Sequence, residues 1–257
     1  MSAIAHTWFM AERHLRALMR QPWWIVISLV QPVTYLLLYG QVFSRVVELP
    51  GFNATNYTTF VTPGIVIMMA LFGGGWNGMV IIMEIDQGVM DRFLVSPVSR
   101  VAIIAGRLMQ MAFIVAFQSL ILLGLGFLTG ARYAGGVVGL IVLLVCGVLI
   151  AVPFGALSNA MALMIRRTES VIGASNFILL PMTFLSPVFM EPALMPGWIR
   201  TVSRFNPVAW SVEAARSALS PAPDWRLIAN RMGLLVLLSI ASAWLAARAF
   251  RAYQRST

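Results

Sequence analysis

Six long apolar runs divide the sequence, and they restrict the fold more than any other feature. A helix needs about 20 mostly apolar residues to cross a hydrocarbon core of roughly 30 Å. Six stretches meet that requirement: Trp23–Phe43, Phe60–Met83, Leu108–Leu128, Val137–Ile165, Val171–Met190 and Met232–Ala247. The sequence therefore predicts an all-α membrane protein with six transmembrane helices.

The composition agrees with a membrane protein and limits its chemistry. Hydrophobic residues make up 60% and charged residues 11% of the 257 residues, whereas soluble domains carry about 25% charged residues. The net charge is +9, but the arginines lie at the ends of apolar runs, which argues against nucleic-acid binding. The chain contains no lysine, which excludes a GxxxxGK[ST] phosphate-binding loop. Cys146 is the single cysteine, so an intrachain disulfide is excluded and a buried apolar position is expected.

Residues 1–22 have the pattern of an amphipathic helix. Apolar side chains fall within one arc at 100° per residue, and arginines gather opposite them: Ile4, Trp8, Ala11, Leu15 and Leu18 against Arg13, Arg16 and Arg20. We expect residues 1–22 to form an interfacial helix on membrane lipids and residues 23–257 to form a single six-span domain. A plain positively charged anchor is the alternative.

The arginines also predict orientation. With the N-terminus inside, eleven of the 18 arginines lie on the cytoplasmic side, and five of the other seven lie between the fifth and sixth apolar runs. Short cytoplasmic connections are the ones enriched in basic residues. We therefore expect a multi-pass plasma-membrane protein with both termini in the cytoplasm.

The stretch 84–107 is the most polar segment between two apolar runs. It carries three carboxylates and three arginines, with a break at Ser96-Pro97: Glu84, Asp86, Asp91, Arg92, Arg100 and Arg107. A charged segment joined directly to two spans is typical of a cytoplasmic loop through which a force can act on the membrane domain.

The connection 191–230 predicts a short helix of its own. Asn206 supplies an N-cap, and Pro207 has the fixed φ angle that suits the first residue of a helix. Apolar residues then follow at helical spacing until Pro221. The helix is too short and too charged to span, and Trp residues alternate with arginines around it. We expect it to lie at, or dip into, the outer leaflet, with a solvated loop as the alternative.

Polar residues within the apolar runs are amides and hydroxyls, and no Asp or Glu lies deep in a run. Such groups mostly form hydrogen bonds between helices, and four are the candidates for lining a substrate path: Asn77, Gln118, Asn159 and Asn176. Because ion-driven carriers need a titratable group there, energy for transport would come from elsewhere. The glycines Gly73, Gly74, Gly75 and Gly78 allow close helix contact or local unwinding.

Three segments carry a resemblance to a known family: QPVTYLLLYGQVF (31–43), EIDQGVMDRFLVSPVSR (84–100) and PALMPGWIRTVSRFNPVAWSVEAARSAL (192–219). The chain resembles the transmembrane permease subunit of ABC-2 exporters, of the drug-resistance and antibiotic-export type. The resemblance implies six spans, an N-terminal interfacial helix, a cytoplasmic coupling helix and short external re-entrant helices. It also implies an ABC ATP-binding subunit, which holds ATP and Mg, and a second permease copy or paralogue.

The resemblance also assigns residues, none of them catalytic or metal-binding. The coupling segment would comprise Glu84, Asp86, Gly88, Asp91, Arg92, Ser96 and Pro97, and the external helices would include Asn206, Pro207, Glu213 and Arg216. The chain departs from the family at Asp86-Gln87, where many relatives carry Arg followed by Glu.

The expected function is export of a hydrophobic drug-like or lipid substrate by ATP hydrolysed on a separate chain. An exporter of polysaccharide or glycolipid is an alternative within the same family. A membrane-embedded lipid-modifying enzyme is a second class, although Asp86 and Asp91 are the only close aspartates that could form its carboxylate pair. A passive channel or scaffold is a third class, and a neighbouring gene for a P-loop ATPase would argue against it.

Overall fold

The structure is a computed structural model that describes residues 22–52, 54, 56–87, 100–165 and 167–254. All regular structure in these residues is helical, as predicted. In chain order the elements are α2 (Pro22–Val42), η1 (Ser44–Glu48), α3 (Tyr57–Gly75), α4 (Asn77–Asp86), α6 (Arg100–Leu128), α7 (Gly136–Ile165), α8 (Thr168–Phe184), η2 (Pro192–Leu194), α9 (Gly197–Ser203), α10 (Pro207–Leu219) and α11 (Trp225–Gln254). The predicted interfacial helix at residues 1–22 falls almost entirely outside the described residues.

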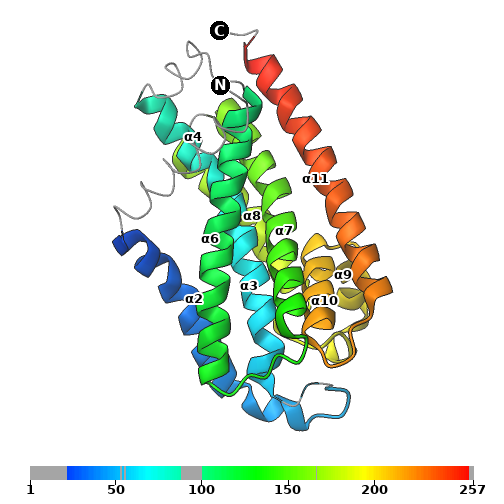
Figure 1. The fold of residues 1–257 in the computed structure, drawn as a ribbon. Helices are drawn as coiled ribbons and strands as arrows, with labels where there is room; N and C mark the ends of the chain where they lie inside the picture. The colour runs from blue at the N-terminus through cyan, green and yellow to red at the C-terminus, as the bar shows by residue number, and fades with distance from the viewer. Residues whose placement is uncertain (1–21, 53, 55, 88–99, 166, 255–257) are drawn as a thin grey trace.

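The central element is α3, with α2, α6, α7, α8 and α10 around it (Figure 1). Of the most apolar window in α3–α4, 67% is buried inside the protein, against 17% of the window in α11. Helices at the periphery expose large apolar side chains such as Trp23, Phe127 and Phe177. Exposed apolar surface on this scale suits lipid rather than water.

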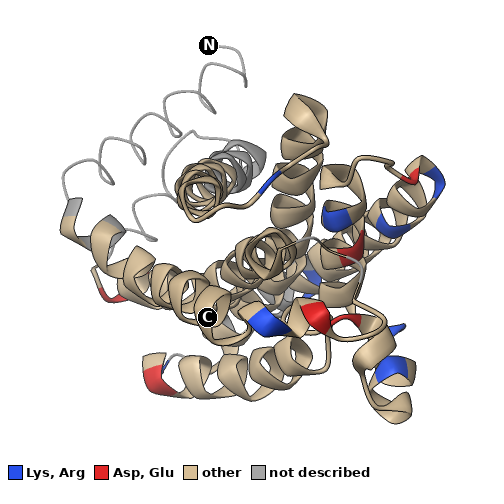
Figure 2. Ribbon diagram, turned by 90° about the horizontal axis from the view of Figure 1, so that it is seen from below, with Lys and Arg blue, Asp and Glu red and all other residues tan. Residues whose placement is uncertain are grey.

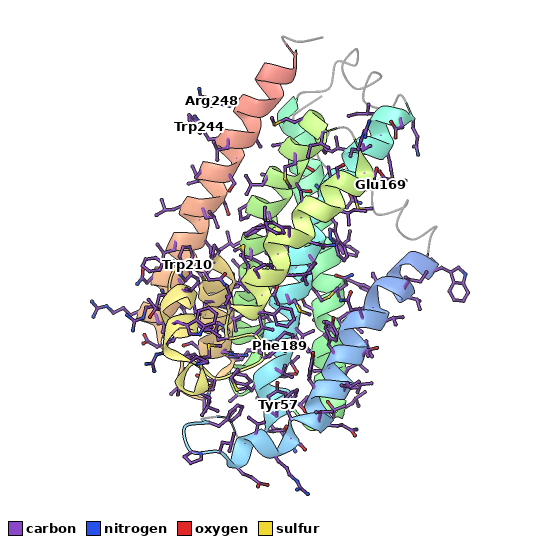
Figure 3. All side chains as sticks on the ribbon, turned by 180° about the vertical axis from the view of Figure 1, so that it is seen from behind. Tyr57, Glu169, Phe189, Trp210, Trp244 and Arg248 are labelled. Atoms are coloured by element: carbon purple, nitrogen blue, oxygen red, sulfur yellow. The ribbon has the colours of Figure 1, made fainter. Side chains whose placement is uncertain are left out.

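The helices run between two ends of an elongated bundle (Figure 1). The end of α4 and the C-terminal end of α11 are both at one end of the bundle, which we call the Asp86 end. Figure 3 shows Glu169 and Arg248 near that end, and Tyr57 near the opposite end. Seen along the bundle, most of the ribbon carries neither acidic nor basic residues (Figure 2).

Two separate apolar clusters hold the helices together. The main core is built mainly from α3, α6, α7 and α10 and includes Ile65, Leu122, Ile150 and Val212. A second cluster is small and lies toward the Asp86 end; its buried members are Ile81, Ile82, Ala162 and Val171. α4 and the facing ends of α7 and α8 contribute these residues.

The predicted apolar runs agree with the helices in part. Within the described residues, four helical stretches are long and apolar enough to cross a membrane: 57–86, 110–128, 136–162 and 225–246. The first predicted run contains a shorter apolar helix, Val26–Val42. The fifth predicted run, 171–190, is helical only as far as Phe184, where α8 ends and turns and bends follow, and the second, 60–83, is divided between α3 and α4 at Trp76. The predicted count of six spans stays a prediction.

Candidate functional site

The most polar region inside the bundle surrounds a break between α3 and α4. α3 ends at Gly75 and α4 begins at Asn77, with Trp76 between them at φ −94° and ψ −1°. Three consecutive glycines precede the break, and glycine lowers helix stability by about 1 kcal/mol per residue. A helix end leaves backbone groups without partners inside the helix. At this depth those groups need partners from neighbouring helices.

Serines from α7 and α8 supply those partners. Ser175 Oγ donates a hydrogen bond to the Gly75 carbonyl at 2.8 Å. The backbone N–H of Gly78 donates to Ser158 Oγ at 3.0 Å. Both serine side chains are buried. The backbone on the two sides of the break is therefore bonded to two different helices.

Amide side chains extend the same network. Trp76 Nε1 donates to Asn176 Oδ1 at 3.1 Å, and Asn77 Nδ2 donates to Asn159 Oδ1 at 3.1 Å. Three of the four predicted path residues thus lie together, partly buried. We call the following set the polar layer: Trp76, Asn77, Ser158, Asn159, Ser175 and Asn176.

Close contact between helices at this level depends on glycine. A Cβ on Gly74 would lie within 3.0 Å of the Ala151 backbone, and a Cβ on Gly78 would lie 2.7 Å from Ser158 Oγ. Gly73 has open space around it. Both alternatives considered for these glycines, close helix contact and local interruption of the helix, occur together.

Gln118, the fourth predicted path residue, lies apart from the polar layer. Its Nε2 donates to Ser28 Oγ at 3.0 Å, which joins α6 to α2. Gln118 also lines a small pocket with Val66, Met69 and Ser119. Its amide therefore belongs to a different helix contact.

The short helix predicted from Asn206-Pro207 is present as α10. The side chain of Asn206 caps it, because Oδ1 accepts from the Val208 N–H at 3.0 Å. Its Nδ2 donates to the carbonyls of Met182 at 2.7 Å and Leu185 at 3.1 Å. One side chain thus starts α10 and also binds the last turn of α8. No α10 residue is exposed, so α10 packs within the protein rather than lying as a solvated loop.

Arg216 ties α10 to the start of α3. Its Nε donates to the Phe60 carbonyl at 3.0 Å, and its Nη2 donates to the Val188 carbonyl at 2.8 Å. The guanidinium carbon lies 3.4 Å from the centroid of the Phe60 ring. Burial lowers the pKa of Arg216 to about 9, with Glu191 the main opposing charge. The side chain is therefore charged at neutral pH.

Glu213 lies on the same helix and pairs with α11. Its Oε2 is 2.8 Å from Arg231 Nη2. Burial raises the pKa of Glu213, and the charge of Arg231 opposes that rise. Close by, the Tyr57 hydroxyl donates to the Phe189 carbonyl at 2.9 Å, which joins the first turn of α3 to the segment after α8. These contacts tie α10, α3, α11 and the segment after α8 together toward the end opposite Asp86.

The predicted coupling segment is described only where it leaves α4. Glu84 is partly buried in α4, and Asp86 is the exposed last residue of that helix. The remaining predicted coupling residues lie outside the described residues: Gly88, Asp91, Arg92, Ser96 and Pro97. α4 thus leads directly from the polar layer into this segment.

The sequence patterns missed Trp76 as a member of the polar layer. Its signal was available, because a buried indole N–H usually finds a hydrogen-bond acceptor. They also missed the double role of Asn206 beyond its cap. No local pattern could have found it, because its other partners lie 21 and 24 residues away.

Known proteins resemble this chain over most of its length. The model of the ABC-2 type transporter family matches residues 5–220. The daunorubicin resistance ABC transporter permease protein DrrB1 of Streptomyces coeruleorubidus is 27% identical, over 85% of this chain and 75% of its own length. The probable doxorubicin resistance ABC transporter permease protein DrrC of Mycobacterium tuberculosis is 22% identical, over 91% and 82%. The inner membrane transport permease YadH of Escherichia coli is 25% identical, over 83% of each chain.

Proposed function

The chain belongs to the ABC-2 type transporter family, and from that premise we propose that it exports a hydrophobic drug-like or lipid substrate across the plasma membrane. The observation that carries this proposal is the family match over residues 5–220, together with two relatives named for resistance to daunorubicin and doxorubicin. In this proposal the chain is the permease subunit. A separate ABC ATP-binding subunit binds ATP and Mg and hydrolyses the ATP.

The proposed topology has six membrane crossings. They are α2, α3 with α4, α6, α7, α8 and α11, with both termini in the cytoplasm. α9 and α10 would be the external re-entrant helices, held by Asn206, Pro207, Glu213 and Arg216. Residues 1–22 would be an interfacial helix and residues 23–257 one transmembrane domain. Tyr57 lies at the end opposite Asp86, so in this proposal the external helices that pack near it and the coupling segment lie on opposite sides of the membrane.

The proposed contact with the ATPase is the segment from Glu84 to Pro97. In support, α4 leads into this segment and packs against α7 and α8, so a force on the segment reaches three helices. Replacing Glu84 or Arg92 should weaken binding of the ATPase or separate hydrolysis from export. If both variants copurify with the ATPase and show substrate-stimulated ATPase activity equal to wild type, the proposed coupling role of this segment is contradicted.

The proposed substrate path lies between this chain and a second permease, either an identical copy or a paralogue. Asn77, Gln118, Asn159 and Asn176 are the side chains proposed to line it. The positions of these four side chains support this role, since each is partly buried at a contact between helices. Replacing each by Leu should change which substrates stimulate the ATPase. An unchanged ranking of substrates in all four variants would count against the path.

The test of the function is reconstitution. The chain is copurified with the ATPase encoded beside it, placed in liposomes, and assayed for ATPase stimulation and export with drugs, lipids and glycolipids. Stimulation and export by apolar drugs or lipids would support the proposal. A response to glycolipids alone would favour the polysaccharide or glycolipid alternative. Metal-dependent conversion of a lipid by the chain alone would favour the enzyme instead.

A further inference from the structure

On three helices, residues of the main core give way to residues of the second cluster at the same level along the bundle. On each of three helices, a residue of the main core is followed or preceded by a residue of the second cluster. The change falls between Phe72 and Ile81 on α3–α4, between Phe154 and Ala162 on α7, and between Val171 and Leu179 on α8. The polar layer occupies the interval on all three helices. Along these three helices, a layer of hydrogen-bonded polar side chains thus separates the two apolar clusters.

The hydrogen bonds of the polar layer all join different helices. Asn159 and Ser158 bind the start of α4 from α7, and Asn176 and Ser175 bind the break itself from α8. Hydrogen bonds between membrane helices are weak on average, because their groups can find other partners. Interlocked apolar side chains, in contrast, resist sliding because any shift opens a void. Relative motion is therefore easiest at the polar layer.

The backbone of α3–α4 is already interrupted at this level, whereas α7 and α8 run through it as continuous helices and must bend there. α3 and α4 are already separate helices, so a change in their angle need not break a continuous ladder of hydrogen bonds. Gly74 and Gly78 face the backbone of α7 without side chains that interlock. Sharp kinks in helices occur at features of this kind.

We propose that the polar layer is a flexure about which an upper unit rocks against the main core. The upper unit is α4 with the C-terminal end of α7 and the N-terminal end of α8. This inference rests on the proposed function, in which the segment after α4 receives force from an ATPase. α4 has 10 residues, so it is about 15 Å long, and a tilt of about 10° at Trp76 moves its end by about 3 Å.

The flexure is tested first on the purified chain, without an ATPase. Spin labels are placed on exposed positions in a Cys146→Ala background. Met83→Cys with Leu120→Cys spans the polar layer, whereas Met83→Cys with Glu169→Cys lies within the upper unit. Pulsed electron paramagnetic resonance in lipid nanodiscs should give a broader distance distribution for the spanning pair. Equal widths for the two pairs would overturn the proposal.

Loss of the serine bonds should loosen the flexure. Ser158→Ala with Ser175→Ala should broaden the spanning distribution by a further few ångströms. The matched control is Ser239→Ala, which removes the bonds from Ser239 Oγ on α11 to the carbonyls of Leu149, at 3.3 Å, and Leu235, at 2.8 Å, beside the main core. The control should leave the spanning pair unchanged. No broadening in the double variant, or the same broadening in the control, would overturn the proposal.

Reconstitution with the ATPase separates a flexure from a substrate contact. In the double serine variant, transport per ATP hydrolysed should fall several-fold while the ranking of substrates stays the same. A changed ranking at unchanged transport per ATP would overturn the flexure and leave a path-lining role. If the wild-type chain binds no ATPase, the proposed function fails, and the distance measurements still decide the flexure.

Discussion

Replacing Arg216 by Gln should destabilise the protein substantially. The variant loses two hydrogen bonds from a charged donor, 3.0 Å to the Phe60 carbonyl and 2.8 Å to the Val188 carbonyl. A shorter neutral amide cannot reach both acceptors. Hydrogen bonds to charged groups contribute about 1.5–3 kcal/mol each, and removing a partly buried Arg also recovers some of its cost of desolvation. We expect a net loss of about 2–4 kcal/mol in the free energy of unfolding.

The chain carries its own reporter for this experiment. Cys146 is the single cysteine and is fully buried in the main core, so a thiol-reactive fluorogenic dye labels it only when the core opens. In a protein of this size, 1 kcal/mol shifts Tm by about 2–4 °C. The apparent Tm of Arg216→Gln should therefore fall by roughly 5–15 °C.

Two further variants make the result specific. Arg200→Gln makes the same chemical change at an exposed position on α9, and its apparent Tm should stay near that of wild type. Arg216→Lys keeps the charge but not the forked donor, so it should fall between the other two. If Arg216→Gln unfolds at the same temperature as Arg200→Gln, Arg216 does not hold α10 to α3.

Three more predictions use the same dye assay. Gly74→Ala should lower the apparent Tm by several degrees because its Cβ would meet the α7 backbone, whereas Gly73→Ala, with open space around it, should be neutral or slightly stabilising; equal effects would refute the close contact. Asn206→Ala removes a cap and two hydrogen bonds and should cost about 2–4 kcal/mol; a loss no larger than about 1 kcal/mol would mean that only the cap matters. Burial raises the pKa of Glu213 in the folded state, so folding favours its protonated form and its contribution to stability grows as pH falls; the apparent Tm of wild type relative to Glu213→Gln should therefore rise from pH 7 toward pH 5, and a difference independent of pH would contradict the shift.

Local signals predicted the elements that depend on a few adjacent residues. Asn206-Pro207 predicted the start of α10 correctly, because an N-cap acts on the next two or three residues. The apolar runs predicted helices for the same reason, since length and hydropathy belong to each segment alone. The break at Trp76 was not predicted as a position, because a hydropathy window averages over it. The end of α8 at Phe184 was missed because apolar residues continue beyond it.

The candidate site depends on contacts between residues that are far apart in the sequence. Asn77 and Asn159 are 82 residues apart, Trp76 and Asn176 are 100 apart, and Arg216 and Phe60 are 156 apart. Each amide was recognisable as a polar group in an apolar run. Its partner was not, because the partner depends on the register and rotation of one helix against another.

The sequence by itself determined that this is a helical membrane protein, and its motifs indicated the transporter family to which it belongs. Both conclusions follow from the residues along the chain, since apolar runs of about 20 residues cross lipid as helices and the motifs are local. Only the tertiary structure decided that three of the four path candidates share one layer, that Gln118 lies outside it, and that this layer divides two apolar cores. The physical reason is that polar groups inside a bundle must find partners, and only the packing of the helices decides which groups come within reach.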